Sequence, residues 1–127
     1  MEALHAMKVS KHFDRTEFAC RCGCGFDTVD VDLARVLEDL REKADSPIRI
    51  TSGCRCKIHN KAIGGSDFSM HMWGKAADIV VDGMTPSAVY DYLDEKYPDK
   101  YGIGLYQRGV GGWVHIDVRP SKSRWTK

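Results

Sequence analysis

The stretch Ser69-Met70-His71-Met72-Trp73-Gly74-Lys75-Ala76-Ala77-Asp78 leads from a turn into an apolar segment that continues to Val81. Small and β-branched residues over 76–81 predict a buried strand, and Asp78 lies inside it. A carboxylate in such a strand needs a partner that offsets the loss of its hydration. We therefore expect the fold to be built around a polar site on this strand.

A second strand is predicted by the alternation in Trp113-Val114-His115-Ile116-Asp117. Its valine and isoleucine would face the core, while His115 and Asp117 would share the other face. Together, His71, Asp78 and His115 make a three-ligand set that leaves a fourth position open on a tetrahedral zinc ion. The same residues can also be separate hydrogen-bonded side chains, and spacing alone leaves both interpretations open.

Helical periodicity predicts two amphipathic helices, over 30–44 and from Thr85-Pro86 to just before Pro98. Short strands are expected at 48–51, 101–107 and 112–119, the last two joined by a hairpin at 108–111. Strands with few, separate helices indicate an α+β fold in which helices flank a small, central, mainly antiparallel sheet.

Length and composition favour a single domain spanning residues 1–127, with 1–12 as a loose N-terminal arm and 120–127 as a C-terminal tail. Nineteen basic and eighteen acidic residues leave a net charge of +1, which argues against nucleic acid as the main partner. No apolar run reaches the roughly 18 residues that span a bilayer, and the N-terminus lacks the apolar core of a signal peptide. We therefore expect synthesis in the cytoplasm and no membrane span.

Five cysteines fall in two clusters, one formed by Cys20, Cys22 and Cys24 and the other by Cys54 and Cys56. Disulfides or free thiols are one interpretation, although five cysteines leave one over. A structural metal site is the other, because zinc in structural sites prefers thiolate ligands. Neither spacing is the usual pair separated by two residues, so both interpretations stay open.

The chain resembles the M15 family of zinc peptidases, the group of D-alanyl-D-alanine carboxypeptidases and murein peptidases that shares its fold with the hedgehog signalling domain. The resemblance covers roughly residues 12–120. It rests on these motifs: Ser52-Gly53-Cys54-Arg55, His59-Asn60, Gly64-Gly65, Ser69-Met70-His71, Gly74-Lys75-Ala76-Ala77-Asp78, Gly102-Ile103-Gly104-Leu105-Tyr106 and Val114-His115-Ile116-Asp117-Val118-Arg119.

The resemblance implies one catalytic zinc ion held by His71, Asp78 and His115. It implies that Arg55 pairs with a carboxylate of the substrate. Ser69 matches a serine two residues before the first ligand, where it would contact the substrate or a zinc ligand.

The chain departs from this family at one position. Members often place the catalytic carboxylate three residues before the last histidine ligand, and that position here is Gly112. Asp117 is the nearest candidate for the catalytic base by sequence, and it shares the predicted strand face with His115. Its alternative role is to orient an imidazole by a hydrogen bond.

The resemblance implies a zinc metallopeptidase that hydrolyses peptidoglycan stem peptides, as a D,D-carboxypeptidase or a murein endopeptidase. The expected protein is a monomer that acts on the cell wall, as a phage or prophage lytic enzyme or a part of a phage particle does. The alternative is a non-catalytic module that contains zinc and binds a cell-wall peptide or a protein, and Gly112 is the feature that favours it.

Overall fold

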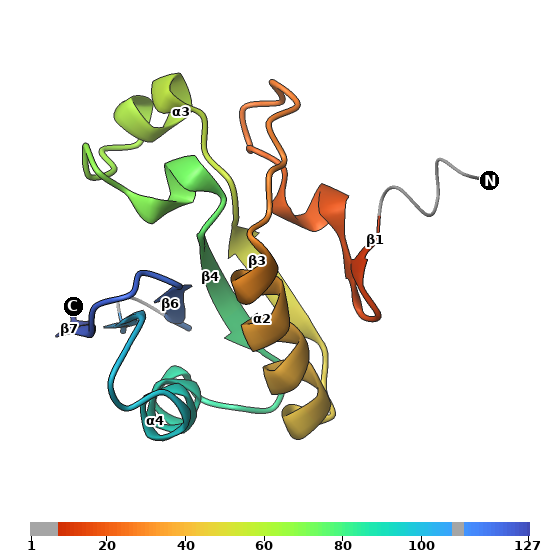
Figure 1. Ribbon diagram of the computed structural model, residues 1–127, viewed down its shortest axis with the longest axis vertical. Helices are drawn as coiled ribbons and strands as arrows, with labels where there is room; N and C mark the ends of the chain where they lie inside the picture. The colour runs from red at the N-terminus through yellow and green to blue at the C-terminus, as the bar shows by residue number, and fades with distance from the viewer. Residues whose placement is uncertain (1–7, 108–110) are drawn as a thin grey trace.

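A five-stranded sheet forms the centre of the computed structural model, which describes residues 8–107 and 111–127 (Figure 1). In sheet order the strands are β3 (Ile48–Ser52), β4 (Ala76–Val81), β6 (Trp113–Asp117), β5 (Gly102–Tyr106) and β7 (Ser123–Thr126). The first four strands pair antiparallel, and β7 pairs parallel with β5. The expected α+β fold with a mainly antiparallel sheet is therefore confirmed.

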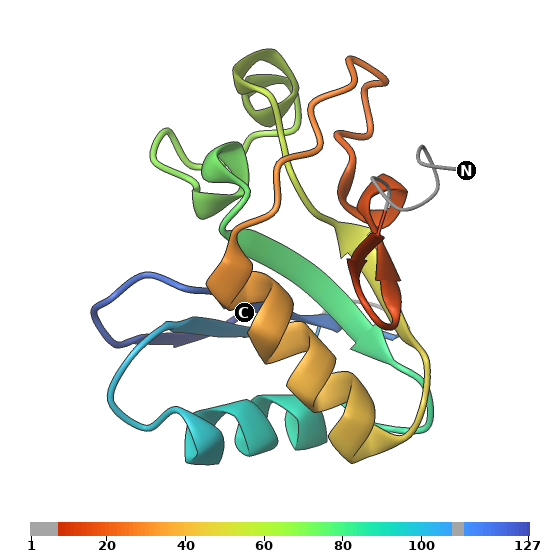
Figure 2. The ribbon, with the colours of Figure 1, turned by 45° about the vertical axis from the view of Figure 1, so that its right-hand side comes forward.

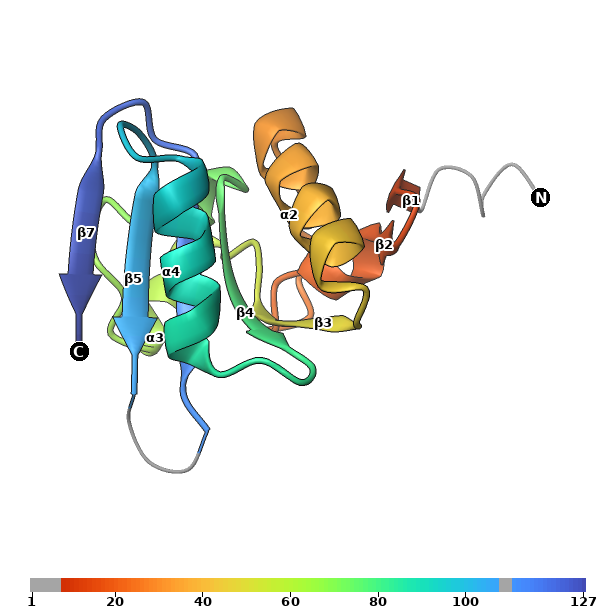
Figure 3. The ribbon, with the colours of Figure 1, turned by 90° about the horizontal axis from the view of Figure 1, so that it is seen from below.

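Two helices, α2 (Val31–Ala44) and α4 (Pro86–Lys96), lie against one face of the sheet (Figure 3). Asp30 caps α2 and Thr85 caps α4 by accepting hydrogen bonds from amides of the first helical turn. Within residues 8–107 and 111–127, no helix combines the length and the apolar character needed to cross a bilayer.

The core lies between these helices and the inward face of the sheet. Leu37 of α2 and Leu93 of α4 are fully buried there, together with Val114 and Ile116 of β6. The alternation predicted for 113–117 is thus confirmed, because the aliphatic residues of β6 face the helices. The residues between them face the opposite side of the sheet, where the polar site lies.

A short helix, α3 (Lys57–Ala62), and a 3-10 turn, η2 (Met70–Trp73), lie together at one end of the sheet, away from α4 (Figure 2). Gly74 ends η2 in the left-handed conformation, so that the chain turns directly into β4. The backbone carbonyl of Gly74 also accepts from the Asp30 amide, at 2.8 Å, which ties this turn to the start of α2.

The N-terminal segment differs from the expected loose arm over 1–12. Its described part forms β1 (Lys8–Ser10), which pairs antiparallel with β2 (Phe13–Asp14), and a 3-10 helix, η1 (Arg15–Phe18), follows. Glu38 of α2 holds this hairpin: Ser10 Oγ donates to its carboxylate at 2.6 Å and the His12 amide at 2.9 Å.

The C-terminal tail expected at 120–127 also differs, because it adds β7 to the sheet. Arg124 of β7 donates to Asp94 of α4 at 2.7 Å and to the carbonyls of Tyr97 and Tyr101 at 2.6 Å each. Arg124 thus supplies hydrogen-bond donors to backbone carbonyls at the end of α4 and in the loop that follows. These contacts make the C-terminal segment part of the fold. Of the hairpin expected at 108–111, residues 108–110 lie outside the described part.

We predict that Glu38→Ala destabilises the fold by about 1–3 kcal/mol, because Ser10 and His12 lose a partly buried acceptor. Burial raises the pKa of Glu38, but hydrogen bonds from Ser10 and His12 outweigh it and lower the pKa. A lowered pKa in the folded state stabilises the protein above the ordinary pKa of about 4.3 and loses this effect as the pH falls. The destabilisation should thus be complete at neutral pH and shrink below about pH 4.

Urea unfolding at a series of pH values measures this difference. Exposed Glu95 of α4 supplies the control Glu95→Ala. Equal losses of stability in the two variants would contradict the role given to Glu38.

Candidate functional site

Three potential metal ligands meet on the face of the sheet opposite α2 and α4. Asp78 of β4 and His115 of β6 are direct cross-strand partners, and η2 brings His71 to them. One ligand atom from each residue lies within 4.8 Å of the other two, and all three residues are buried. The set expected from the sequence is therefore assembled by two strands and the turn that precedes one of them.

The hydrogen bonds of His71 determine which of its ring nitrogens faces the site. Nδ1 lies 2.6 Å from the carbonyl oxygen of Gly53, and a carbonyl only accepts, so Nδ1 carries the hydrogen. In the neutral imidazole, Nε2 then has no hydrogen and presents its lone pair to the site. It is buried, makes no hydrogen bond within the described chain and lies 3.3 Å from Asp78 Oδ1.

His115 is held in a similar way by Asp117. The Nε2 group donates to Asp117 Oδ2 at 2.7 Å, and Nδ1 lies 3.1 Å from Asp78 Oδ1. Burial raises the pKa of Asp117, but hydrogen bonds from His115 and Arg119 outweigh it and lower the pKa, so this carboxylate stays ionised and accepts. When His115 is neutral, its Nδ1 lone pair therefore points toward Asp78.

The three atoms that converge here suit a cation. Two imidazole lone pairs facing one carboxylate oxygen repel it unless a positive charge lies between them. Zinc bonds of about 2.0–2.2 Å in a tetrahedral site place neighbouring ligand atoms roughly 3.4 Å apart. The 3.3 and 3.1 Å separations from Asp78 Oδ1 are close to that value. The unpaired Nε2 of His71 is the polar atom that such an ion would satisfy.

Asp117 is the most constrained residue of the site. It is fully buried, and its Oδ1 accepts from Arg119 Nε at 2.8 Å and from the Gly102 amide at 3.2 Å. Gly102 lies opposite it on β5, where an added Cβ would come within 2.4 Å of the carboxylate. The glycine therefore leaves the space that Asp117 occupies.

A cleft of about 560 Å³ opens over these ligands, and Arg55 lies on its wall. Arg55 Nε donates to Ser52 Oγ at 3.2 Å, and its two terminal nitrogens lie 3.2 Å from Asn60 Oδ1 and 3.5 Å from Asp78 Oδ2. These contacts hold the guanidinium in one orientation. A fixed guanidinium beside a metal site can bind a carboxylate by paired hydrogen bonds.

Ser69 is the residue before η2, and it also lines the cleft. Its hydroxyl oxygen accepts from the His71 amide at 3.2 Å, so it helps to place that imidazole. The hydroxyl hydrogen is free of this bond and can be donated to a ligand in the cleft.

The chain matches a protein-family model described as Peptidase M15 over residues 11–117. It belongs to the peptidase M15 family. No curated protein matches the chain. The family resemblance seen in the motifs is thereby confirmed, and the matched segment runs from the turn between β1 and β2 to the end of β6.

Several residues around the three potential ligands had no role assigned from the sequence. Asn60 is buried between Arg55 and the carbonyl of Ser66, and Trp125 of β7 packs 5.1 Å from the His115 ring, centroid to centroid. Asn60 stood in a quoted motif, and strand alternation could have found Arg119 two residues after Asp117. Nothing in the sequence placed Trp125, because its position depends on β7.

Gly112, the position where the family resemblance led us to look for a catalytic carboxylate, has a backbone that favours glycine. Its φ is +79°, and a Cβ there would lie 2.4 Å from the Tyr106 carbonyl oxygen. Among the described residues that line the cleft, Asp78 is the only one with a carboxylate side chain. A side chain at position 112 would therefore require the end of β5 or the segment before β6 to shift.

We predict that Gly112→Ala destabilises the fold clearly more than Gly83→Ala. Gly83 has nearly the same φ, +78°, but no heavy atom lies within 4 Å of its added Cβ. The shared left-handed strain costs about 1–2 kcal/mol in each variant. The contact with Tyr106 should add at least about 1 kcal/mol in Gly112→Ala alone.

The free energies of unfolding in urea test this comparison. Equal values for the two alanine variants would show that the Tyr106 carbonyl moves away freely, and that Gly112 is kept for its backbone conformation alone.

Proposed function

We propose that this M15 peptidase is a zinc metallopeptidase that hydrolyses peptide bonds in peptidoglycan stem peptides, with zinc held by His71, Asp78 and His115. The observation that carries the proposal is the unpaired, buried Nε2 of His71, which faces the carboxylate of Asp78 beside the His115 ring. When bound there, zinc would supply a Lewis acid that polarises the scissile carbonyl and acidifies water.

Arg55 is proposed to bind a carboxylate of the substrate. It is a charged group fixed by Ser52 and Asn60 on the wall of the cleft that holds the ligands. A stem peptide carries carboxylates at its C-terminus and on its side chains. Pairing with either would set which peptide bond lies over the metal ligands, and so would separate a D,D-carboxypeptidase from an endopeptidase.

Asp117 is proposed to orient His115 and to keep its proton on Nε2. Of the two roles that the sequence left open, general base or partner of an imidazole, the contacts support the second. The carboxylate is fully buried, both of its oxygens are bonded to His115 or Arg119, and it does not line the cleft. A positioning residue of this kind raises the basicity of a metal-binding imidazole.

The aromatic wall of the cleft is proposed to contact the peptide and exclude water. The rings of Tyr106 and Trp113 are stacked, with their centroids 4.9 Å apart and an angle of 6° between their planes. Trp125 Nε1 donates a hydrogen bond to the Tyr106 hydroxyl at 2.9 Å. Rings held in this way present a rigid surface to a ligand. The corresponding biological role is degradation of the cell wall, such as that of a phage lytic enzyme.

The proposal predicts metal-dependent cleavage of purified peptidoglycan. Zinc-loaded protein should release D-alanine or shortened stem peptides, identified by mass spectrometry. A chelator should abolish release, and added zinc should restore it. Arg55→Lys should raise KM or lower kcat/KM at least about tenfold, because lysine lacks the planar fork that pairs with a carboxylate.

Arg49→Lys is the matched control, because Arg49 is exposed on β3 and does not line this cleft. A binding module without turnover is the second candidate, favoured by Gly112 and the lack of a further carboxylate among the described cleft residues. No release by protein whose zinc at His71 is confirmed would reject the peptidase in favour of that module.

A separate prediction concerns Asp117→Asn. Loss of a charged partner of a metal-binding imidazole should weaken zinc binding at this site about 10–100-fold. We expect the free zinc that half-saturates activity to rise accordingly, with most of kcat recovered at saturating zinc. A kcat that stays near zero when zinc is saturating would instead identify Asp117 as the general base. Exposed Asp99 provides the control Asp99→Asn.

A further inference from the structure

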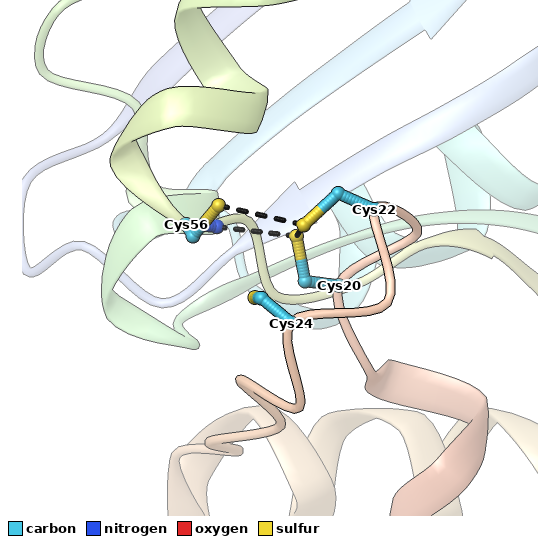
Figure 4. Close-up of side chains that lie close together, drawn as sticks. All are labelled: Cys20, Cys22, Cys24 and Cys56. Carbon is cyan, nitrogen blue, oxygen red and sulfur yellow. Dashed lines mark hydrogen bonds between the residues drawn. The ribbon is translucent and has the colours of Figure 1, made fainter.

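Four of the five cysteines gather at a second place in the molecule. Cys20, Cys22 and Cys24 lie on the loop after η1, and Cys56 is the N-cap residue of α3 (Figure 4). Their four sulfur atoms all lie within 4.8 Å of one another. In Figures 1 and 2 this loop and the start of α3 lie side by side at the same end of the sheet.

The fifth cysteine does not take part. Cys54 is buried, with 2% of its surface exposed, and lies outside the cluster although it is only two residues from Cys56. Its amide donates to the Phe18 carbonyl at 2.7 Å. The odd cysteine count is thus explained by four clustered thiols and one core residue, and no pairing with another chain is needed.

The sulfur separations fit a metal site better than disulfides. Cys22 Sγ lies 3.4 Å from Cys20 Sγ and 3.7 Å from Cys56 Sγ, whereas a disulfide bond measures about 2.05 Å. Four thiolates around zinc, each at about 2.3 Å, lie about 3.8 Å apart. A tetrahedral metal site requires each sulfur to lie about this far from the other three, and Cys22 Sγ meets this for two of them. Two disulfides would instead place each sulfur within bonding distance of one partner.

The backbone around the cluster is arranged to support thiolates. The Cys56 amide donates to Cys20 Sγ and the His59 amide to Cys56 Sγ, each at 3.3 Å. The Cys20 amide donates to the Phe26 carbonyl at 2.8 Å, which closes the loop. The three cysteines of this loop, each separated from the next by one residue, then face the same point. Amide donors around clustered sulfurs stabilise the negative charge that metal-bound thiolates carry.

We propose that Cys20, Cys22, Cys24 and Cys56 bind a structural zinc ion, at a second site that does not depend on the proposed peptidase activity. Four thiolates complete a tetrahedral shell and leave no open position, which is the property of structural rather than catalytic zinc. No electron transfer is involved: each thiol loses a proton as it becomes a ligand. The ion would be bound only while the thiols stay reduced.

The site would hold together two segments that are far apart in the sequence, the loop after η1 and the start of α3. Cys22 and Cys24 are exposed, as are the two glycines beside them, so this loop buries little of its own surface. The partner segment contains Arg55, which directly precedes Cys56 and whose amide donates to the His71 carbonyl at 2.9 Å. A metal at the cysteines would therefore fix the backbone on one side of the cleft.

Cobalt substitution tests the proposal on the unaltered protein. Metal-free, reduced protein loaded with Co²⁺ should develop the intense near-ultraviolet absorption of thiolate-to-cobalt charge transfer. The His71, Asp78 and His115 set contains no sulfur and cannot produce this band. The band should persist in His71→Ala, so it reports on the cysteine site even if the other site binds no metal. Its absence from fully reduced, folded protein would overturn the proposal.

Zinc content provides the second measurement. Reduced wild-type protein should bind one more zinc ion per chain than Cys24→Ser, and Cys54→Ser should bind as much as the wild type. Equal zinc in Cys24→Ser and the wild type, or intact-mass loss of two hydrogens per cysteine pair in protein purified under reducing conditions, would reject the metal site. If Cys24→Ser fails to fold, the cobalt spectrum of the wild type still decides.

Discussion

The burial of one carboxylate, that of Asp78, constrains most of this structure. Asp78 lies between Ala77 and Ile79 in a strand whose other residues are almost entirely apolar, and its own residue surface is 9% exposed. Burial raises the pKa of Asp78, but the imidazoles of His115 and His71, when protonated, outweigh it and lower the pKa well below the ordinary range. An ionised group in this position has to be surrounded by matching partners. The register of β6 and the turn at η2 supply them.

The two faces of the sheet therefore differ in role: one forms the hydrophobic core and the other carries the polar site. On β4 and β6 the residues that face α2 and α4 are small or aliphatic and provide the hydrophobic stabilisation. Their neighbours in sequence face the other side and carry Asp78, His115 and Asp117. On β5 the same alternation places Gly102 and Gly104 opposite Asp117 and His115, where an added Cβ would meet the Asp117 carboxylate and the Trp125 ring. The core and the site are thus built by one alternating pattern.

Most features that depend on local periodicity could be predicted from the sequence. The helix expected at 30–44 is α2 at Val31–Ala44, and the faces of β6 are as the alternation indicated. Features that depend on where distant segments meet could not. Nothing local shows that Ser123–Thr126 adds a parallel strand, or that Glu38 holds the hairpin at Lys8–Ser10. The same limit explains why spacing alone left open whether His71, Asp78 and His115 form a set, which the family resemblance implied, and did not decide the role of Asp117.

The cysteine cluster shows why spacing was insufficient there too. Sequence spacing suggested three cysteines in one group and two in another, whereas the structure divides them as four and one. Cys54 and Cys56 are separated only by Arg55, but the segment 53–56 between β3 and α3 is neither strand nor helix, so strand alternation does not place the two cysteines on one side. Here Cys54 enters the core with Phe18, Arg55 lies on the wall of the cleft, and Cys56 caps α3 beside Cys20. Three adjacent residues thus serve the core, the cleft and the sulfur cluster. A change in the backbone at any one of them must alter the other two environments, so the position of the Arg55 guanidinium depends on contacts on both sides of it.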